Sequence, residues 1–358
     1  MSMATIWQFI ESTETYPDFS LATLPAMEER VRAGGPPIVA LNVFGQDGIT
    51  IGFNEDPNQI LDVALCRELG IAFRRRVNGG GTIYAAAGSC VIAFALPAGL
   101  AGLPQTATQA FETVLPVVAQ ATERRFAIPA RWRPMNDIEV EGRKLMPTSV
   151  KIENGVLTFR IMINVKAIDT AVAGRLMPMP PEKVRDKVHK DIASRFTCLE
   201  AELGRAVAGE ELAGLAHDIA AALFPEISLV PAAAPASVYP PEMAGEAWDF
   251  ARAEDRLFGP LRRPGDRVGR GREKAPGGMI WVALLVRDEK IVRAIVNGDF
   301  PARPVHAPRR LEQLLEGCPA EADAVRRVVE TFQTDDSHEL AGVSADALLV
   351  AFSKAVAA

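Results

Sequence analysis

Three consecutive arginines, Arg74–Arg76, lead through Val77 and Asn78 into three consecutive glycines, Gly79–Gly81, and then into the β-type tripeptide Thr82-Ile83-Tyr84. Because glycine has no Cβ, such a backbone can come close to a ligand and point its N–H groups at it. Neighbouring guanidiniums add charge and planar donor forks that suit phosphate or carboxylate. The run therefore predicts a loop that cradles an anion and leads into strand-like residues.

The length and charge of the chain limit the number of domains and the kinds of binding partner that it can have. A chain of 358 residues is too long for one ordinary core and predicts at least two domains. Its formal net charge of −6 gives no reason to expect binding to nucleic acid or to an anionic membrane, so the anion site must be local. The apolar run 90–97 ends at a proline and is too short to span a membrane, which predicts a buried strand.

The cysteines and histidines do not predict a metal site. The cysteines are scattered without a CxxC pair, no histidine stands at metal-ligand spacing, and no secretory signal is present. We therefore expect a cytoplasmic protein without a structural metal, and surface or capping roles for the histidines. The residues concerned are Cys66, Cys90, Cys198, Cys318, His189, His217, His306 and His338.

Strands and helices alternate through the first ~200 residues, which is typical of an α/β or α+β domain. We expect strands at 37–44, 49–53 and 90–97, and helices at 57–69, at about 105–122 and within 181–223. The predicted fold class is α+β (mixed α/β), with a mixed, mostly antiparallel sheet flanked by helices.

A break in composition at 231–237 and again at Pro240-Pro241 marks the best candidate for a linker, because small residues and prolines leave nothing to bury there. We therefore expect a catalytic domain at 1–228, a linker at 229–245 and a small α+β accessory domain at 246–358. Within the last part, 279–286 and 291–296 predict a β-hairpin, and helices are expected near 309–315 and 320–331.

A second group of chemically active residues lies in the segment 136–145, where Ile138 and Val140 alternate with acids before a Glu-Gly turn. If Glu141-Gly142 is the turn, Glu139 pairs with Lys144 and Asp137 lies diagonally on the same face. Such a carboxylate can hold a divalent cation, and such a lysine can neutralise charge at a phosphate or carboxylate. Taken alone, this segment is better explained as a solvated hairpin with surface ion pairs.

Taken together, the two groups resemble the lipoate–protein ligases of the biotin/lipoate ligase and octanoyltransferase superfamily. The similarity is carried by Arg75-Arg76, by Gly79–Gly81 with Thr82-Ile83-Tyr84, by Asn136-Asp137 and by Gly142-Arg143-Lys144. It extends to the segments 19–22, 50–52, 58–59, 159–164 and 194–197 and, more loosely, to Trp248 and to 277–296. The resemblance thus covers nearly the whole predicted catalytic domain.

The resemblance implies a two-step reaction in which Mg²⁺-ATP activates lipoate as lipoyl-adenylate and the lipoyl group passes to a lysine of an acceptor. The acceptors would be lipoyl-domain proteins, namely 2-oxo-acid dehydrogenase acyltransferase subunits and the glycine-cleavage H protein, and the enzyme would be a monomer. Lys144 would be catalytic, contacting the carboxylate, the ATP α-phosphate and the mixed anhydride, and Asp137 would hold Mg²⁺. The adenylate phosphate would be cradled by Arg76, Gly79, Gly80, Gly81, Thr82, Ile83 and Tyr84.

Three departures from the family pattern predict a change in substrate or rate. Ala85–Ser89 stand where the family usually carries His-Asp and then Gly-Asn, Phe53 replaces an arginine, and Met146–Thr148 replace a run of small residues. The altered segments could favour a different short or medium-chain acid.

Three alternatives to the ligase remain open. An ATP-independent octanoyl or lipoyl transferase needs a nucleophilic cysteine or an activated lysine, and Cys90 is the candidate thiol, although a core strand explains it better. Biotin ligase is suggested by Gly269–Arg272, which we interpret instead as a mobile basic loop. The third alternative is a binding module that retains the fold and binds the adenylate without turnover.

Overall fold

The computed structural model describes residues 5–100, 103–104, 106–134, 136–178 and 196–357. The chain forms two compact units, each built from separate stretches of sequence. The first unit contains Met1–Gly48, Ala85–Thr170 and His189–Tyr239, and the second contains Ile49–Tyr84, Ala171–Val188 and Pro240–Ala358. The boundaries at 1–228, 229–245 and 246–358 stay a prediction.

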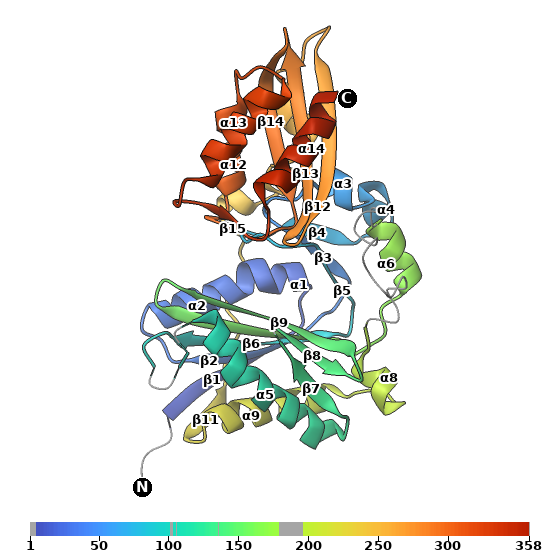
Figure 1. Ribbon diagram of the computed structural model, residues 1–358. Helices are drawn as coiled ribbons and strands as arrows, with labels where there is room; N and C mark the ends of the chain where they lie inside the picture. The colour runs from blue at the N-terminus through green and yellow to red at the C-terminus, as the bar shows by residue number, and fades with distance from the viewer. Residues whose placement is uncertain (1–4, 101–102, 105, 135, 179–195, 358) are drawn as a thin grey trace. The chain divides into compact units, whose positions relative to one another are not determined.

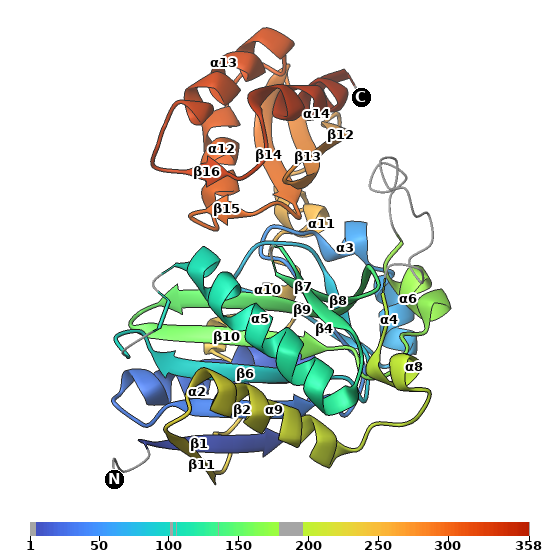
Figure 2. The ribbon, with the colours of Figure 1, turned by 60° about the horizontal axis from the view of Figure 1, so that its bottom comes forward.

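The first unit is built on one eight-stranded sheet, which Figure 2 shows in full. In spatial order its strands are β11 (Ile227–Pro231), β1 (Thr5–Ser12), β2 (Ile38–Val43), β6 (Cys90–Pro97), β10 (Val156–Ile163), β9 (Arg143–Glu153), β8 (Asp137–Val140) and β7 (Ala130–Arg133). β1 runs parallel to both of its neighbours, and the remaining pairs are antiparallel. The predicted mixed, mostly antiparallel sheet is confirmed.

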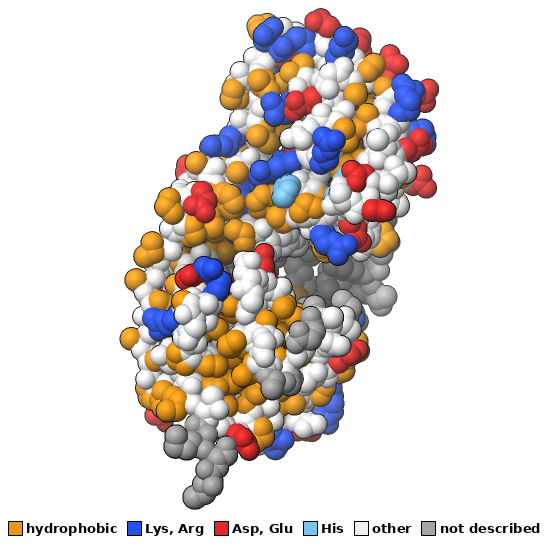
Figure 3. Space-filling view, turned by 90° about the vertical axis from the view of Figure 1, so that its left-hand side faces the viewer, with side chains coloured by type: hydrophobic (Ala, Val, Ile, Leu, Met, Phe, Trp, Pro, Cys, Tyr) orange, Lys and Arg blue, Asp and Glu red, His pale blue; other side chains and the backbone are white. Residues whose placement is uncertain are grey.

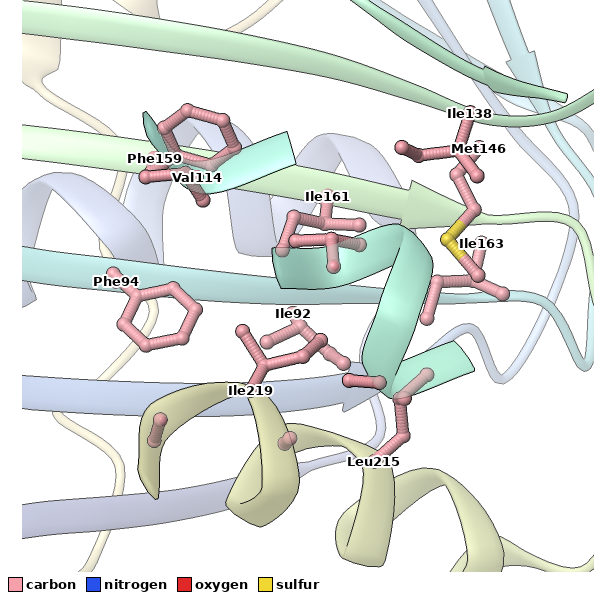
Figure 4. Close-up of a cluster of buried hydrophobic side chains, with 14 of the residues drawn as sticks. Ile92, Phe94, Val114, Ile138, Met146, Phe159, Ile161, Ile163, Leu215 and Ile219 are labelled. Carbon is pink, nitrogen blue, oxygen red and sulfur yellow. The ribbon is translucent and has the colours of Figure 1, made fainter. Parts of the chain in front are cut away.

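Helices cover both faces of this sheet. α5 (Ala107–Phe126) and α9 (Gly209–Leu223) lie on one face, and α2 (Leu24–Arg32) packs against β6 and β10 on the other (Figures 1 and 2). Ile92 and Phe94 on β6 point toward the first pair of helices and meet Leu215 and Ile219 of α9 in the main core (Figure 4). Shorter segments of this unit are α1 (Tyr16–Asp18), the π-helical turn η1 (Phe19–Thr23) and α8 (Leu199–Leu203).

The second unit contains a small sheet of three strands in the order β4 (Ala72–Arg75), β3 (Gly48–Ile51), β5 (Ile83–Ala85). It packs with α3 (Pro57–Ile60), α4 (Val63–Glu68) and α6 (Thr170–Leu176) around Ile49, Ile51 and Leu65. The single helix expected at 57–69 is wrong, because Leu61 is extended and the Asp62 side chain caps a new helix by accepting from Leu65 N.

The rest of the second unit is a twisted sheet in the order β12 (Arg267–Ala275), β13 (Gly278–Arg287), β14 (Lys290–Gly298), with helices α12 (Ala307–Leu315), α13 (Ala322–Gln333) and α14 (Ala345–Ala357) packed beside it (Figure 1). The predicted hairpin is confirmed as β13 and β14, with Asp288 and Glu289 at positive φ in the turn. The remaining segments are η3 (Pro241–Met243), α10 (Glu246–Asp249), α11 (Glu254–Phe258), β15 (Ala302–Arg303) and β16 (Glu339–Leu340).

The segment Gly269–Arg272, expected to be a mobile basic loop, is instead part of strand β12. Its glycines allow α14 to lie directly on the strand. A Cβ added at Gly269 would lie 1.7 Å from Ala355 O, and one at Gly271 would lie 1.8 Å from Ala351 O. The mobile-loop prediction was therefore wrong, because the glycines serve close packing between helix and sheet.

Within the described part of the chain, no helix combines the length and the apolar character needed to cross a lipid bilayer.

Candidate active site

The glycine loop follows β4 and is closed by the side chain of Arg76. Arg76 is 8% exposed, and its guanidinium donates from Nη1 to Thr50 O and Oγ1, both at 3.0 Å, and from Nη2 to Gly79 O and Gly81 O at 3.1 and 2.9 Å. Gly80 has a φ of +89°, which glycine adopts without strain. Arg76 thus bends the loop around its own guanidinium, and its contact with a phosphate stays a prediction.

On its other side, the glycine loop passes very close to the chain at Gly52. A Cβ added at Gly52 would lie 1.9 Å from Gly80 O, so only glycine fits at this position. Glu55 accepts from Gly52 N at 2.7 Å and from Thr82 Oγ1 at 3.0 Å. The predicted cradle residues Thr82, Ile83 and Tyr84 lead out of this loop into β5, as the sequence predicted.

Arg75, the neighbour of Arg76, is fully buried and bonded to main-chain carbonyls. Nη1 donates to Gly52 O, Phe53 O and Glu55 O at 3.1, 2.8 and 2.7 Å, Nη2 donates to Asp249 O at 2.7 Å, and Nε donates to Trp248 O at 3.0 Å. Burial, together with the charge of Arg252, lowers the pKa of Arg75 to about 10, so it stays charged at neutral pH. By these hydrogen bonds, Arg75 links the segment 52–55, which follows β3, to α10.

The predicted Asp137–Lys144 hairpin forms in the first unit. Glu141 and Gly142 make the turn with φ of +50° and +79°, and Glu139 pairs with Lys144. Lys144 Nζ lies 2.7 Å from Asp137 Oδ2, with side-chain exposures of 28% and 12%. The geometric prediction is therefore confirmed, because one ammonium and one carboxylate do face the same space.

The surroundings of Lys144 give it a fixed position. Its carbonyl accepts from Thr197 N at 2.9 Å, and its ammonium lies 6.0 Å from the centroid of the Phe196 ring. Asp137 Oδ1 is buried and has no hydrogen-bond partner among the described residues. An unpartnered carboxylate oxygen of this kind can coordinate a hard cation whose other ligands come from phosphate and water. Asp137 therefore fits the predicted Mg²⁺. The described residues contain no cluster of three or more His, Cys, Asp or Glu side chains suited to a metal.

The segment Ala85–Ser89, which departs from the family pattern, forms a turn packed on the first unit. Gly88 N donates to Phe44 O and Phe44 N donates to Ser89 O, both at 2.8 Å, and Ala87 N donates to Asp47 Oδ1 at 2.7 Å. Ala85 and Ala86 are buried. The turn is thus held by its main chain, and two methyl groups stand where the resemblance predicted polar side chains.

Three of the cysteine thiols are buried. Cys90 is fully buried at the start of β6, and burial raises the pKa of its thiol. Burial also raises the pKa values of the Cys66 and Cys198 thiols. The core-strand interpretation of Cys90 is confirmed.

The histidines of the described chain take varied positions. The ring of His217 packs against Phe9, His306 is exposed at the start of α12, and His338 packs on Phe332. His189 lies outside the described residues.

A pocket of about 660 Å³ opens beside β12 in the second unit. Arg270 and Trp281 line it together with Asp56 and Glu254, and Arg270 Nε donates to Glu254 Oε2 at 2.8 Å. Asp56 is 2% exposed and accepts from Asn58 N and Glu254 N at 2.9 and 3.0 Å. Burial nevertheless raises the pKa of Asp56 to about 6.

Asp56 should therefore make stability depend on pH. Its folded-state pKa lies above the unfolded value of 3.8, so the contribution of this group falls as pH rises from about 4 to above 6. In the wild type, this group should lower the free energy of unfolding by about 3 kcal/mol across that pH range, and Asp56→Asn should abolish this decrease. Urea unfolding of both proteins at several pH values measures the difference. Parallel pH profiles for variant and wild type would contradict this.

The structure brings Asp137 and Lys144 together in the first unit, and Arg76, Gly79, Gly80, Gly81, Thr82, Ile83 and Tyr84 together in the second. Sequence reasoning did not identify Arg75 as a structural residue, nor Arg309, whose guanidinium lies 4.9 Å from the centroid of the Phe53 ring. The one available signal for Arg75 was its place in the arginine run.

Comparison with known proteins adds independent information. A family model described as the lipoyl protein ligase A/B catalytic domain matches residues 19–216. Octanoyltransferase LipM of Geobacillus kaustophilus (strain HTA426) is 22% identical over 232 residues, which cover 58% of this chain and 82% of that protein.

Solved structures share the fold. P. falciparum LipL1 in complex with lipoate matches with a TM-score of 0.63 and 14% identity, over 90% of this chain and 94% of that chain. A lipoate-protein ligase A bound with ATP matches with a TM-score of 0.56 and 17% identity, over 69% and 99%.

Proposed function

The chain belongs to the family of lipoyl protein ligase A/B catalytic domains, and from that premise we propose that it is an ATP-dependent lipoate–protein ligase. The carboxylate of lipoate attacks the α-phosphorus of ATP, giving lipoyl-adenylate and pyrophosphate. The ε-amine of a lysine on a lipoyl domain or H protein then attacks the acyl carbon, and AMP leaves. The lipoyl group thereby ends as an amide on the acceptor protein.

The observation that carries this proposal is the burial of the Cys90 thiol. A transferase that works without ATP needs a nucleophilic cysteine or an activated lysine to hold the acyl group, and Cys90 is the candidate thiol. Cys90 is fully buried in a core strand and has a raised pKa, so it is a poor thiolate source. Adenylate chemistry needs no covalent enzyme intermediate and agrees with such a site.

The proposed roles follow from the chemistry of each group. Lys144, held by its ion pair with Asp137, stabilises negative charge on the carboxylate, on the α-phosphate and on the mixed anhydride. The loop from Gly79 to Tyr84, shaped by Arg76, directs its main chain at the adenylate phosphate. Asp137 would hold Mg²⁺, which when bound neutralises charge on the phosphates of ATP.

Octanoyl or lipoyl transfer without ATP is the second candidate, and the curated relatives favour it because they are named octanoyltransferases. The third candidate is a module that binds the adenylate and does not turn over, which the buried Ala85 and Ala86 favour.

One assay separates the three. The purified protein is incubated with an apo lipoyl domain and either lipoate plus ATP or an octanoyl carrier protein without ATP, and Cys90→Ala is run beside wild type. We expect acylation and pyrophosphate release only with ATP, and Cys90→Ala should retain both. Transfer from the octanoyl carrier protein without ATP would establish the transferase instead, and loss of that transfer in Cys90→Ala would show that the thiol holds the acyl group. The binding module would release no pyrophosphate and would bind preformed adenylate in a separate calorimetric measurement.

A further inference from the structure

The three arginines that precede the glycine loop are all engaged by protein groups. Arg74 Nη1 lies 2.9 Å from Asp249 Oδ2, Arg75 is surrounded by carbonyls, and Arg76 donates to Thr50 and to the loop itself. A phosphate held at the loop would therefore gain little from new donors on these side chains. A further cation of the second unit, with its donors uncommitted, would add to the charge that Lys144 and Mg²⁺ are proposed to supply.

Arg309 is such a cation. It is the third residue of α12, the residue as a whole is exposed although its guanidinium is partly desolvated, and its Cζ lies 4.9 Å from the centroid of the Phe53 ring. In the described part of the chain its guanidinium makes no ion pair and no hydrogen bond to a side chain. The nearby acid Glu312 is already bound by Arg252, whose Nη1 donates to Glu312 Oε2 at 3.0 Å.

Hydrogen bonds tie the start of α12 to the glycine loop through residues 52–54. Phe53 N donates to Asn78 O, directly before Gly79, at 2.9 Å. Asn54 Nδ2 donates to Val305 O, just before α12, at 2.7 Å. A Cβ added at Gly79 would lie 3.5 Å from Phe300 O, so the chain leading to α12 passes close to the loop.

Arg309 has one cation and one acid as charged neighbours. Partial desolvation and the charge of Arg252 lower its pKa, whereas the carboxylate of Glu312 acts in the opposite direction. A Cβ added at Gly81 would lie 3.7 Å from Asp299 Oδ2, so the stretch between β14 and β15 also passes close to the loop. On the face that carries α12 and β15, Figure 3 shows Lys and Arg side chains set among hydrophobic ones.

We propose that Arg309 is a nucleotide-binding residue, whose guanidinium donates to phosphate oxygens of ATP held at Gly79–Gly81. Stacking on Phe53 keeps its planar fork in place, so little side-chain entropy is lost when the nucleotide binds. The assignment rests on the proposed ligase function and adds to it a phosphate contact from the C-terminal part of the chain.

The test compares Arg309→Gln with Arg310→Gln, because both residues are exposed neighbours on α12 and only Arg309 lies on Phe53. Binding of ATP, inorganic pyrophosphate and octanoate is measured by calorimetry on the full chain, with circular dichroism as the check on folding. We expect Arg309→Gln to weaken ATP and pyrophosphate about tenfold or more, and Arg310→Gln to change them less than about twofold. Octanoate binding should stay unchanged, and Arg309→Lys should recover part of the loss.

The outcomes separate this proposal from the proposed function. Equal effects of the two glutamine variants on ATP, or an effect confined to octanoate, would overturn the role of Arg309 while leaving the ligase proposal intact. Wild-type protein that binds no ATP would reject both proposals together.

Discussion

Replacing Lys144 with alanine is expected to reduce lipoate-dependent pyrophosphate release by about 10³-fold while the protein stays folded. The Lys144 ammonium is the proposed source of charge stabilisation in both steps, and water cannot replace a positioned cation. The measurement is the rate of pyrophosphate release at saturating ATP and lipoate, together with the thermal unfolding of each protein. Wild-type-like release would remove Lys144 from the mechanism.

Lys151 provides a closely matched control. It lies on the same strand, β9, its side chain is 29% exposed against 28% for Lys144, and it is also ion-paired, with Glu28. Lys151→Ala should therefore lower the stability about as much as Lys144→Ala does, and it should leave the rate of pyrophosphate release nearly unchanged. If both variants lost activity alike, the loss would come from the strand and not from chemistry at Lys144.

Replacing Arg75 with alanine is expected to have the largest effect on stability. Arg75 is fully buried, and its removal leaves the carbonyls of Gly52, Phe53 and Glu55 without these donors. Breaking one buried charged network of this kind lowers the free energy of unfolding by about 3–5 kcal/mol. Urea unfolding followed by circular dichroism measures the difference.

Arg74 is the control for that experiment, since it is the preceding residue and also meets Asp249. Its side chain is 20% exposed and makes an ion pair at 2.9 Å, so Arg74→Ala should cost about 1 kcal/mol. An Arg75 variant no less stable than the Arg74 variant would contradict the structural role assigned to Arg75.

The Asp137–Lys144 hairpin shows what could be predicted from the sequence. Alternation with period two and a Glu-Gly turn are local signals, and the register they imply places Glu139 opposite Lys144 as observed. The same holds for the β13–β14 hairpin and for the strand that begins at Cys90. Short-range patterns were sufficient because the partners lie close together in the chain.

The arginine run shows what could not be predicted. Its residue types indicate an anion site, yet the donors of Arg75 go to carbonyls 20 to 23 and 173 to 174 residues away. No local signal distinguishes an arginine that meets a ligand from one that meets distant main chain. Arg309 was missed for the same reason, because only the folded chain places it over Phe53.

The prediction of a single helix at 57–69 was wrong for a different reason. Its apolar spacing was suitable, but Asp62 caps a new helix after an extended Leu61. Side-chain capping thus overrode periodicity at this point.

In the Gly-Arg-Gly-Arg segment of β12, the glycines and the arginines have different structural roles. Gly269 and Gly271 admit no side chain because α14 lies on them, whereas Arg270 and Arg272 border an open pocket. Glycine should accordingly be retained at 269 and 271 because of α14, whereas Arg270, which donates to Glu254, and Arg272, which lies over the Trp281 ring, are subject to a different constraint. A motif search that treats the four residues as one phosphate-binding signature would join positions that are under unrelated constraints.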